Sequence, residues 1–446
     1  MKQSVNIASR VTGRTPSAPV FRQAWLRRAL IIAVIGYSAL HLAYSVCRYN
    51  IVRGQGSGDV LRTFQELQEW RQTGVLDYTG ILHPPFYYAL LLPFSTLGFD
   101  ALRYTLYAIQ FPLYVAAIIL LVRTMAVGQP AAAHYLIAAV LTVNFQPFLE
   151  TLAMHKVEGF EFVLLCTAIA AFKRRQDVRA GVWTMLAANL KYLPAMLGVY
   201  FVIKREWRAV LGLLVGFLVC LAVTLPIFGA RTVWSSLVHP AAILVTHRHE
   251  GTRPEASIEF QTLQGTVNRW FVGPNGMMQH FRTQGYPQVS QPRVAWAIGN
   301  VLRVVLLGFY CYVIRRRWRP HQRDEMWLRY VCEMSLTLVM IFMLAQASRV
   351  NYAVLLLPAF VMMGLMLYQH PERFGWAERL LFGAAYGCTA MLIPGGVLNR
   401  LPPHPVWGTY HSFAYLWFSV PFYGYLLLGL CAMRCHARLL REGSTR

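Results

Sequence analysis

Apolar segments long enough to cross a bilayer recur along the whole chain, and they limit the possible folds more than any other feature. Most contain about 18 to 22 residues, the length that a helix needs to span the hydrocarbon core. Hydrophobic residues make up 56% of the chain and charged residues only 14%, so an ordinary soluble globular fold is excluded. The sequence therefore predicts an all-α, polytopic membrane protein.

Hydropathy predicts about twelve hydrophobic helices, one or two of them re-entrant, in a single transmembrane domain over residues 29–433. Two hydrophilic outer loops, 48–82 and 229–293, interrupt this domain. Basic cytoplasmic segments, 1–28 and 434–446, flank it. The predicted spans are 29–47, 84–99, 103–123, 134–150, 159–173, 181–203, 208–228, 295–315, 328–346, 351–369, 379–396 and 413–433.

The net charge of +23 is concentrated in clusters at the ends of these spans, such as 173–175, 204–208 and 315–319. Such clusters are typical of cytoplasmic anchors and indicate no nucleic-acid partner. Full crossing by every span would put 173–175 on the outer face. Re-entrant segments at 84–99 and 181–203 remove this conflict, and breaks at Pro84-Pro85 and at Asn189–Pro194 favour them.

The first outer loop contains Asp59, which follows glycines at 54, 56 and 58 and precedes an amphipathic stretch over 59–71. Glycines let a backbone approach a ligand closely, and a partly desolvated acid can act as a base. The alternative is a helix N-cap, where aspartate is favoured. We expect the helix over 59–71 to lie in the headgroup plane.

Other polar residues lie at the mouths of spans or inside them. His83, beside a double proline and Tyr87, is placed to bind a phosphate or sugar; the alternative is a rigid structural rim. Lys191 and Arg349 suit an anionic lipid-linked partner, although Lys191 could instead extend towards the interface from a helix end. The amides predicted at membrane depth include Asn144, Gln146 and Asn351.

The second outer loop interleaves amides, an arginine and aromatic residues, a pattern that suits a sugar site. Its candidates are Gln261, Gln264, Asn268 and Arg269. Most outer acids, including Glu158 and Glu161, are interpreted as solvated charges. The histidine spacing and the lack of an Asp-x-Asp motif predict no metal site, and no cofactor is expected.

The order of these motifs resembles glycosyltransferase family 87, within the membrane-embedded GT-C class, over about residues 29–370. The matching elements are an outer-loop aspartate (Asp59), a Pro-Pro entry after His83, the Asn144/Gln146 pair, the Gly181…Lys191 span and the late loop with Gln261 and Arg269. Arg349 and Asn351 stand where the family often carries a histidine.

This resemblance implies a GT-C-like fold and transfer of a mannose or arabinofuranose-like sugar from a polyprenyl-phosphate donor to a glycolipid or polysaccharide acceptor. The reaction would occur on the outer side of the cell (inner or plasma) membrane, with inversion. Asp59 would be the base, and Lys191, Arg349 or Arg269 would stabilise the departing phosphate. The sugar and acceptor would contact His83, Tyr87, Asn144, Gln146, Gln261, Gln264, Asn268 and Asn351.

Two alternatives remain at this point. A transporter or flippase of lipid-linked sugars also needs many spans and buried charges, but it should show repeats in corresponding halves, and none is visible. A non-catalytic assembly partner that kept the fold and lost the site is the other alternative.

Overall fold

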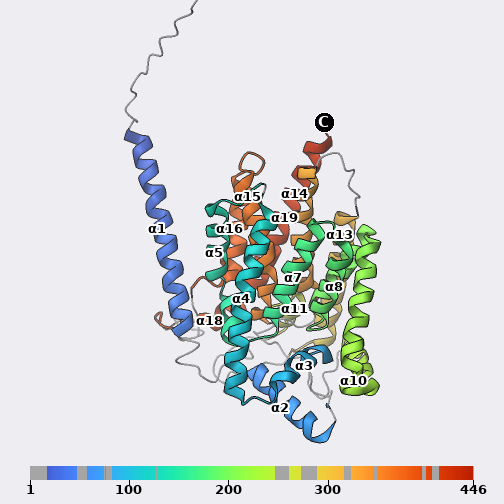
Figure 1. Ribbon diagram of the computed structural model, residues 1–446. Helices are drawn as coiled ribbons and strands as arrows, with labels where there is room; N and C mark the ends of the chain where they lie inside the picture. The colour runs from blue at the N-terminus through green and yellow to red at the C-terminus, as the bar shows by residue number, and fades with distance from the viewer. Residues whose placement is uncertain are drawn as a thin grey trace, which may run out of the picture.

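The computed structural model describes residues 18–47, 58–74, 76, 83–126, 128–246, 261–272, 289–315, 323–345, 349–393, 398–403 and 411–444. Within these ranges the chain forms helices and no β-strand, which confirms the all-α prediction (Figure 1). The helices of the first half are α1 (Ala18–Cys47), α2 (Gly58–Thr73), α3 (Pro85–Leu91), η2 (Leu92–Phe94), α4 (Phe99–Met125), α5 (Ala132–Val143), α6 (Gln146–Ala153), α7 (Glu158–Lys173), α8 (Asp177–Ala188), η3 (Leu193–Ala195) and α9 (Met196–Lys204). Those of the second half are α10 (Trp207–Thr246), α11 (Leu263–Trp270), α13 (Pro292–Ile314), α14 (Arg323–Leu344), η4 (Val350–Leu356), α15 (Leu357–Gln369), α16 (Trp376–Ala390), α18 (His411–Trp417) and α19 (Val420–Ser444).

Five helices of the described residues are long and apolar enough to cross a membrane, or six if the bent pair α5–α6 forms one span. The chain is thus a multi-pass membrane protein, but the predicted number of about twelve is not confirmed. The predicted span over 134–150 is bent rather than continuous, because α5 and α6 meet at 70°. Pro147, in the first turn of α6, favours a new helix start there.

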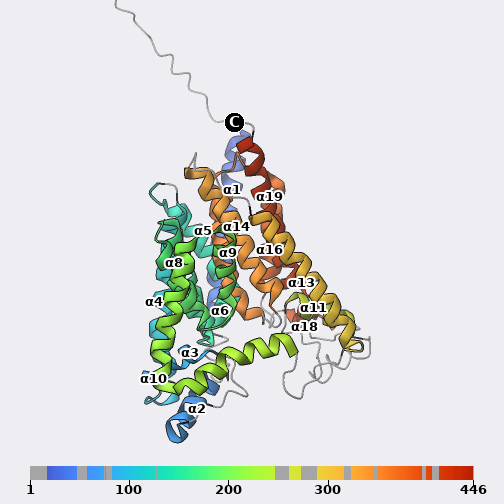
Figure 2. The same ribbon diagram turned by 90° about the vertical axis from the view of Figure 1, so that its right-hand side faces the viewer.

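The second part of α10 also differs from the sequence prediction. The sequence predicts a hydrophilic loop from residue 229 onwards, yet the helix runs on to Thr246 after a kink at Gly229, whose φ is 77°. Only glycine adopts this backbone angle without strain. Figure 2 shows the later part of α10 crossing the lower end of the bundle.

The predicted break at Asn189–Pro194 is confirmed, since α8 ends at Ala188 and α9 begins at Met196. The ring of Phe172, at the end of α7, lies 5.3 Å from Phe201 near the end of α9 and 5.1 Å from Tyr330 near the start of α14. The chain therefore returns through α9 to the level at which α8 began. Segments α8 and α9 form a hairpin whose tip is at Asn189–Pro194.

The returning limb of this hairpin is anchored by a buried ion pair. Lys204 Nζ lies 2.6 Å from Glu333 Oε1 on α14. Tyr200 donates a hydrogen bond of 3.0 Å to the same carboxylate, and His436 Nε2 on α19 lies 3.3 Å from it. Three donors on one carboxylate compensate the cost of burying its charge.

Basic segments gather at the end of the bundle where this anchor lies. Lys173 binds the Thr124 carbonyl at the end of α4, and Arg329 donates to the Leu439 carbonyl of α19 at 2.7 Å. In Figure 1 the start of α1 and the C-terminus lie at the upper end, whereas α2 and α3 lie at the lower end. The hairpin tip points towards the lower end.

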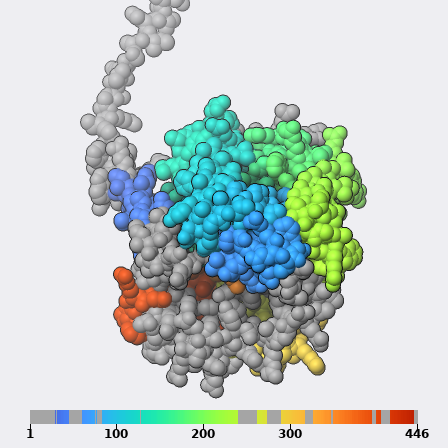
Figure 3. Space-filling model, turned by 60° about the horizontal axis from the view of Figure 1, so that its bottom comes forward, coloured from blue at the N-terminus to red at the C-terminus, as the bar shows by residue number. Residues whose placement is uncertain are grey.

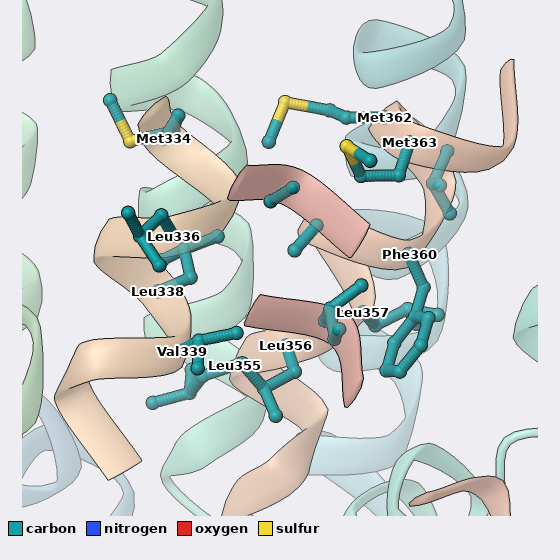
Figure 4. Close-up of a cluster of buried hydrophobic side chains, with 14 of the residues drawn as sticks. Met334, Leu336, Leu338, Val339, Leu355, Leu356, Leu357, Phe360, Met362 and Met363 are labelled. Carbon is teal, nitrogen blue, oxygen red and sulfur yellow. The ribbon is translucent and has the colours of Figure 1, made fainter. Parts of the chain in front are cut away.

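The main apolar core lies between α14, η4 and α15, where methionine, leucine and phenylalanine side chains interlock (Figure 4). Leu355, Leu356 and Phe360 are fully buried there. Such close packing fixes η4, and with it the polar residues at its start.

A second apolar cluster holds α2 against the lower end of the bundle. Figure 3 shows the surface of that end, with α2 on it. The prediction of a helix over 59–71 is confirmed, but its apolar face is not available to headgroups. Val60 and Leu67 are each only 1% exposed, because they pack against residues of α3 and α4. Protein contacts, rather than lipid, bury the face that the sequence pattern showed.

Candidate active site

A buried ion pair lies at the tip of the α8–α9 hairpin. Lys191 Nζ is 2.6 Å from Glu158 Oε1, and the two residues are 9% and 1% exposed. Glu158 is the first residue of α7, so its carboxylate lies at the positive end of the helix dipole. Lys191 follows the end of α8, where the chain has left the helix before the 3₁₀ turn η3. The break that the sequence predicted therefore carries the lysine inward.

The start of η4 completes this centre. The ammonium of Lys191 lies 3.4 Å from the centroid of the Tyr352 ring, a cation–π geometry. Asn351 Nδ2 donates to Glu158 Oε1 at 3.4 Å, and the Asn351 carbonyl accepts from Thr151 of α6 at 3.4 Å. Segments from α6, α7, the hairpin tip and η4 thus converge on one lysine.

Two further polar groups are buried beside the pair. Neither carboxylate oxygen of Glu161 has a hydrogen-bond partner in the described part of the chain, although the residue is fully buried. The same holds for the Tyr114 hydroxyl of α4, which is packed against Gly159 so closely that a Cβ there would lie 1.3 Å from it. Buried polar atoms without partners are rare in folded proteins and point to a place for water or ligand.

Three of the residues predicted to contact phosphate or sugar therefore come together: Lys191, Arg349 and Asn351. Arg349 precedes η4, and its carbonyl accepts from the Tyr352 amide at 3.0 Å. The interpretation of Glu158 and Glu161 as solvated outer charges is wrong, because both are buried. Two acids three residues apart within an apolar segment were the signal that the sequence offered.

His83 and Tyr87 form an adjoining wall at α3. Their rings lie 4.9 Å apart, and both residues are buried. The next residue, Tyr88, donates a hydrogen bond of 2.6 Å to Glu66 of α2. These contacts tie α2 to the double-proline entry of α3.

Asp59 is the second residue of α2, inside its first turn, and its side chain lies outside the described residues. Its neighbour Val60 packs in the same apolar cluster as Val157 and Leu190. Those two residues directly precede Glu158 and Lys191 in the sequence. The apolar cluster therefore joins the start of α2 to both halves of the ion pair.

Asn144 and Gln146 lie at the bend between α5 and α6. Asn144 Nδ2 donates to Ser38 Oγ of α1 at 2.6 Å and to the Val140 carbonyl at 2.9 Å. Gln146 Nε2 donates to Glu150 at 3.3 Å. Asn144 thus holds α1 against the bend.

The residues predicted from the second outer loop bind other parts of the protein. Gln261 donates to the Leu416 carbonyl at 2.9 Å, and Gln264 donates to the Ala295 carbonyl at 3.1 Å. Gln264 also donates to Asn268 at 2.8 Å, and Arg269 donates to Ser419 Oγ at 2.7 Å. These bonds hold α11 against α13 and the α18–α19 junction, not against the ion pair. No group of three or more metal-ligating side chains occurs among the described residues.

Comparison with known proteins identifies the family. The family model of glycosyltransferase family 87 matches residues 82–345, which is more than half of the chain. The match includes Glu158 and Lys191, whereas Asp59 precedes it and Asn351 follows it. Searches of curated proteins and of solved structures returned no match. The resemblance drawn from the sequence is confirmed, and this membrane protein belongs to glycosyltransferase family 87.

Proposed function

We propose that the protein transfers a mannose or arabinofuranose-like sugar from a polyprenyl-phosphate donor to a glycolipid or polysaccharide acceptor, on the outer side of the cell membrane and with inversion. The observation that carries the proposal is the buried, oriented Lys191, which one apolar cluster connects to the start of α2 and hence to Asp59. A cation placed at membrane depth suits a phosphate whose chain lies in lipid.

The reaction is a single displacement at the anomeric carbon. The acceptor hydroxyl gives its proton to Asp59, and its oxygen forms the new bond to the sugar. The bond between that carbon and the phosphate oxygen breaks, and the lipid phosphate leaves with the electron pair. Negative charge grows on the phosphate, so a cation fixed in advance stabilises the transition state.

Lys191 can contact a phosphate without losing Glu158. An ammonium has three N–H donors, and the described contacts of Lys191 are one carboxylate oxygen at 2.6 Å and the face of Tyr352. Glu158 fixes the direction of the ammonium. Arg349, three residues before Tyr352, supplies a second cation that interacts with that phenol.

Charge distribution supports an outer position for the site. The basic ends of α7 and α9 lie together at one end of the bundle, and the hairpin tip with Lys191 points to the other. By the positive-inside rule the basic end is cytoplasmic, so the ion pair and α2 lie towards the outer side.

The test is sugar transfer in proteoliposomes from radiolabelled polyprenyl-phosphate sugars. We expect Asp59→Asn to lower turnover by about 10² to 10⁴-fold, the usual contribution of a general base. Glu69→Gln, on an exposed face of the same helix, is the matched control and should leave turnover unchanged.

Full turnover by the Asp59 variant would remove the proposed base. Donor that crosses the bilayer without transfer, equally in wild type and variant, would support the transporter alternative instead.

A further inference from the structure

Helix α4 has one face buried in the bundle and one face open to its surroundings. Leu102, Leu106 and Gln110 are buried, whereas Tyr104 and Phe111 are 76% and 55% exposed. An apolar helix face that the protein does not cover is typical of contact with lipid.

A groove of about 540 Å³ follows this open face. Its walls are the α4 residues Arg103, Tyr104, Tyr107, Ala108, Phe111 and Pro112, together with His155 from the turn between α6 and α7. Pro112 has no amide hydrogen, so it cannot bond the carbonyl of Ala108 one turn earlier. The groove therefore combines aromatic walls with backbone polarity.

The polar groups of the groove are concentrated at its outer end. Arg103 lies in the second turn of α4, and it pairs with Asp100 at 3.4 Å, whose side chain is 81% exposed. A carboxylate so open to solvent adds little to the binding of the arginine. Phe111 lies about 12 Å deeper along the helix, from the rise of 1.5 Å per residue.

His155 provides the second polar group. It is only 2% exposed, its ring lies 4.6 Å from that of Tyr107, and its Nδ1 has no hydrogen-bond partner in the described part of the chain. Its φ of 53° marks a backbone position that bulky residues rarely adopt. Burial, with Arg103 nearby, lowers the pKa of His155 to about 4, so the ring is neutral at pH 7. A neutral ring can donate one N–H to an anion beside an arginine without repelling it.

We propose that this groove binds an anionic phospholipid of the surrounding bilayer. The lipid phosphate contacts Arg103 and His155, and an acyl chain lies along Tyr104, Phe111 and Pro112. The order of the groups matches a bilayer lipid, with the cation near the end of the span and the apolar walls deeper.

The occupant is a bilayer lipid rather than the sugar carrier because of where the groove opens. Gln110 bonds the Lys156 carbonyl at 3.4 Å, so α4 and the α6–α7 turn separate the groove from Glu158 and Lys191. A carrier phosphate held at Arg103 would therefore be outside the proposed reaction centre. This lipid site requires no catalysis and can be tested apart from transfer.

The test is native mass spectrometry of the full chain in detergent, titrated with phosphatidylglycerol, phosphatidylcholine or a polyprenyl monophosphate. We expect the wild type to retain phosphatidylglycerol in preference to both other probes. Arg103→Gln should weaken this binding about ten- to hundredfold, the range for a charge-assisted hydrogen bond. Arg123→Gln, exposed in the last turn of the same helix, is the matched control and should bind as the wild type does.

Equal binding of phosphatidylglycerol and phosphatidylcholine would overturn the proposal, as would wild-type affinity in Arg103→Gln. Preference for the polyprenyl monophosphate would replace the bilayer lipid by the carrier. Phe111→Ala guards against misfolding, because it truncates an exposed side chain. It should lower affinity for long-chain phosphatidylglycerol more than for a short-chain form, and equal effects on both would contradict the assigned chain position.

Discussion

Removal of Lys191 should destabilise the protein more than removal of its partner Glu158. Both side chains are buried, and Lys191 Nζ lies 2.6 Å from Glu158 Oε1. At that distance the Coulomb energy is about 6 kcal/mol for an effective dielectric constant of 20. Part of this energy offsets desolvation, so breaking such a pair from one side costs about 3–5 kcal/mol. Lys191→Met removes the main cation of Glu158 and of the buried Glu161, whereas Glu158→Gln leaves Lys191 beside Glu161.

The assay is thermal unfolding of both single variants and the double variant in one detergent, read as soluble monodisperse protein after heating. We expect Lys191→Met to lower the unfolding temperature most, Glu158→Gln to lower it less, and the double variant to recover part of the Lys191→Met loss. A recovery of this kind measures coupling between the two side chains. Equal losses in the two single variants, or a double variant that loses their sum, would refute the assignment of one buried, shared cation.

Two more predictions follow from the turns around this centre. Gly159→Ala places a Cβ 1.3 Å from the Tyr114 hydroxyl and should lower the free energy of unfolding by about 1–3 kcal/mol. Gly387→Ala is the control and should change it little, because a Cβ there has nothing within 4 Å. Equal unfolding temperatures for the two variants would contradict the packing around Gly159. The pKa of His155 is lowered from 6.5 to about 4 by burial and by Arg103, so the folded state binds fewer protons than the unfolded state. Stability should fall as the pH drops from about 6.5 towards 4, and His155→Asn should reduce this loss in pH-dependent unfolding; an unchanged pH profile would show that the histidine is not buried neutral.

Much of the helix pattern was predictable because it is local. The break at Asn189–Pro194 combines a proline with polar residues inside an apolar segment, and both disfavour a continuous helix. The number of spans was harder to predict, since hydropathy does not distinguish a crossing from a short apolar helix such as α9. The bend between α5 and α6 likewise depends on where Asn144 meets Ser38, a contact between distant segments.

The site was predictable in part, and the missing part was the partner of the lysine. The sequence singled out Lys191, Arg349 and Asn351, which the structure brings together around Tyr352. Glu158 looked like one of many outer acids, because its burial comes from the hairpin tip and η4 rather than from its own neighbours. Contacts between distant segments decide which charge is buried, and the hydrophobic periodicity of the sequence does not reveal these contacts.

The hairpin of α8 and α9 also sets the distance between two buried ion pairs. Lys191 at its tip and Lys204 at the end of its returning limb each meet a buried carboxylate, Glu158 in one case and Glu333 in the other. One residue inserted between them would turn the limb by about 100° and lengthen it by about 1.5 Å. The two lysines could not then both keep their ion pairs. The two buried carboxylates therefore fix the length of the chain between Lys191 and Lys204. A change at Glu333 that moved Lys204 would therefore also displace Lys191 relative to Glu158.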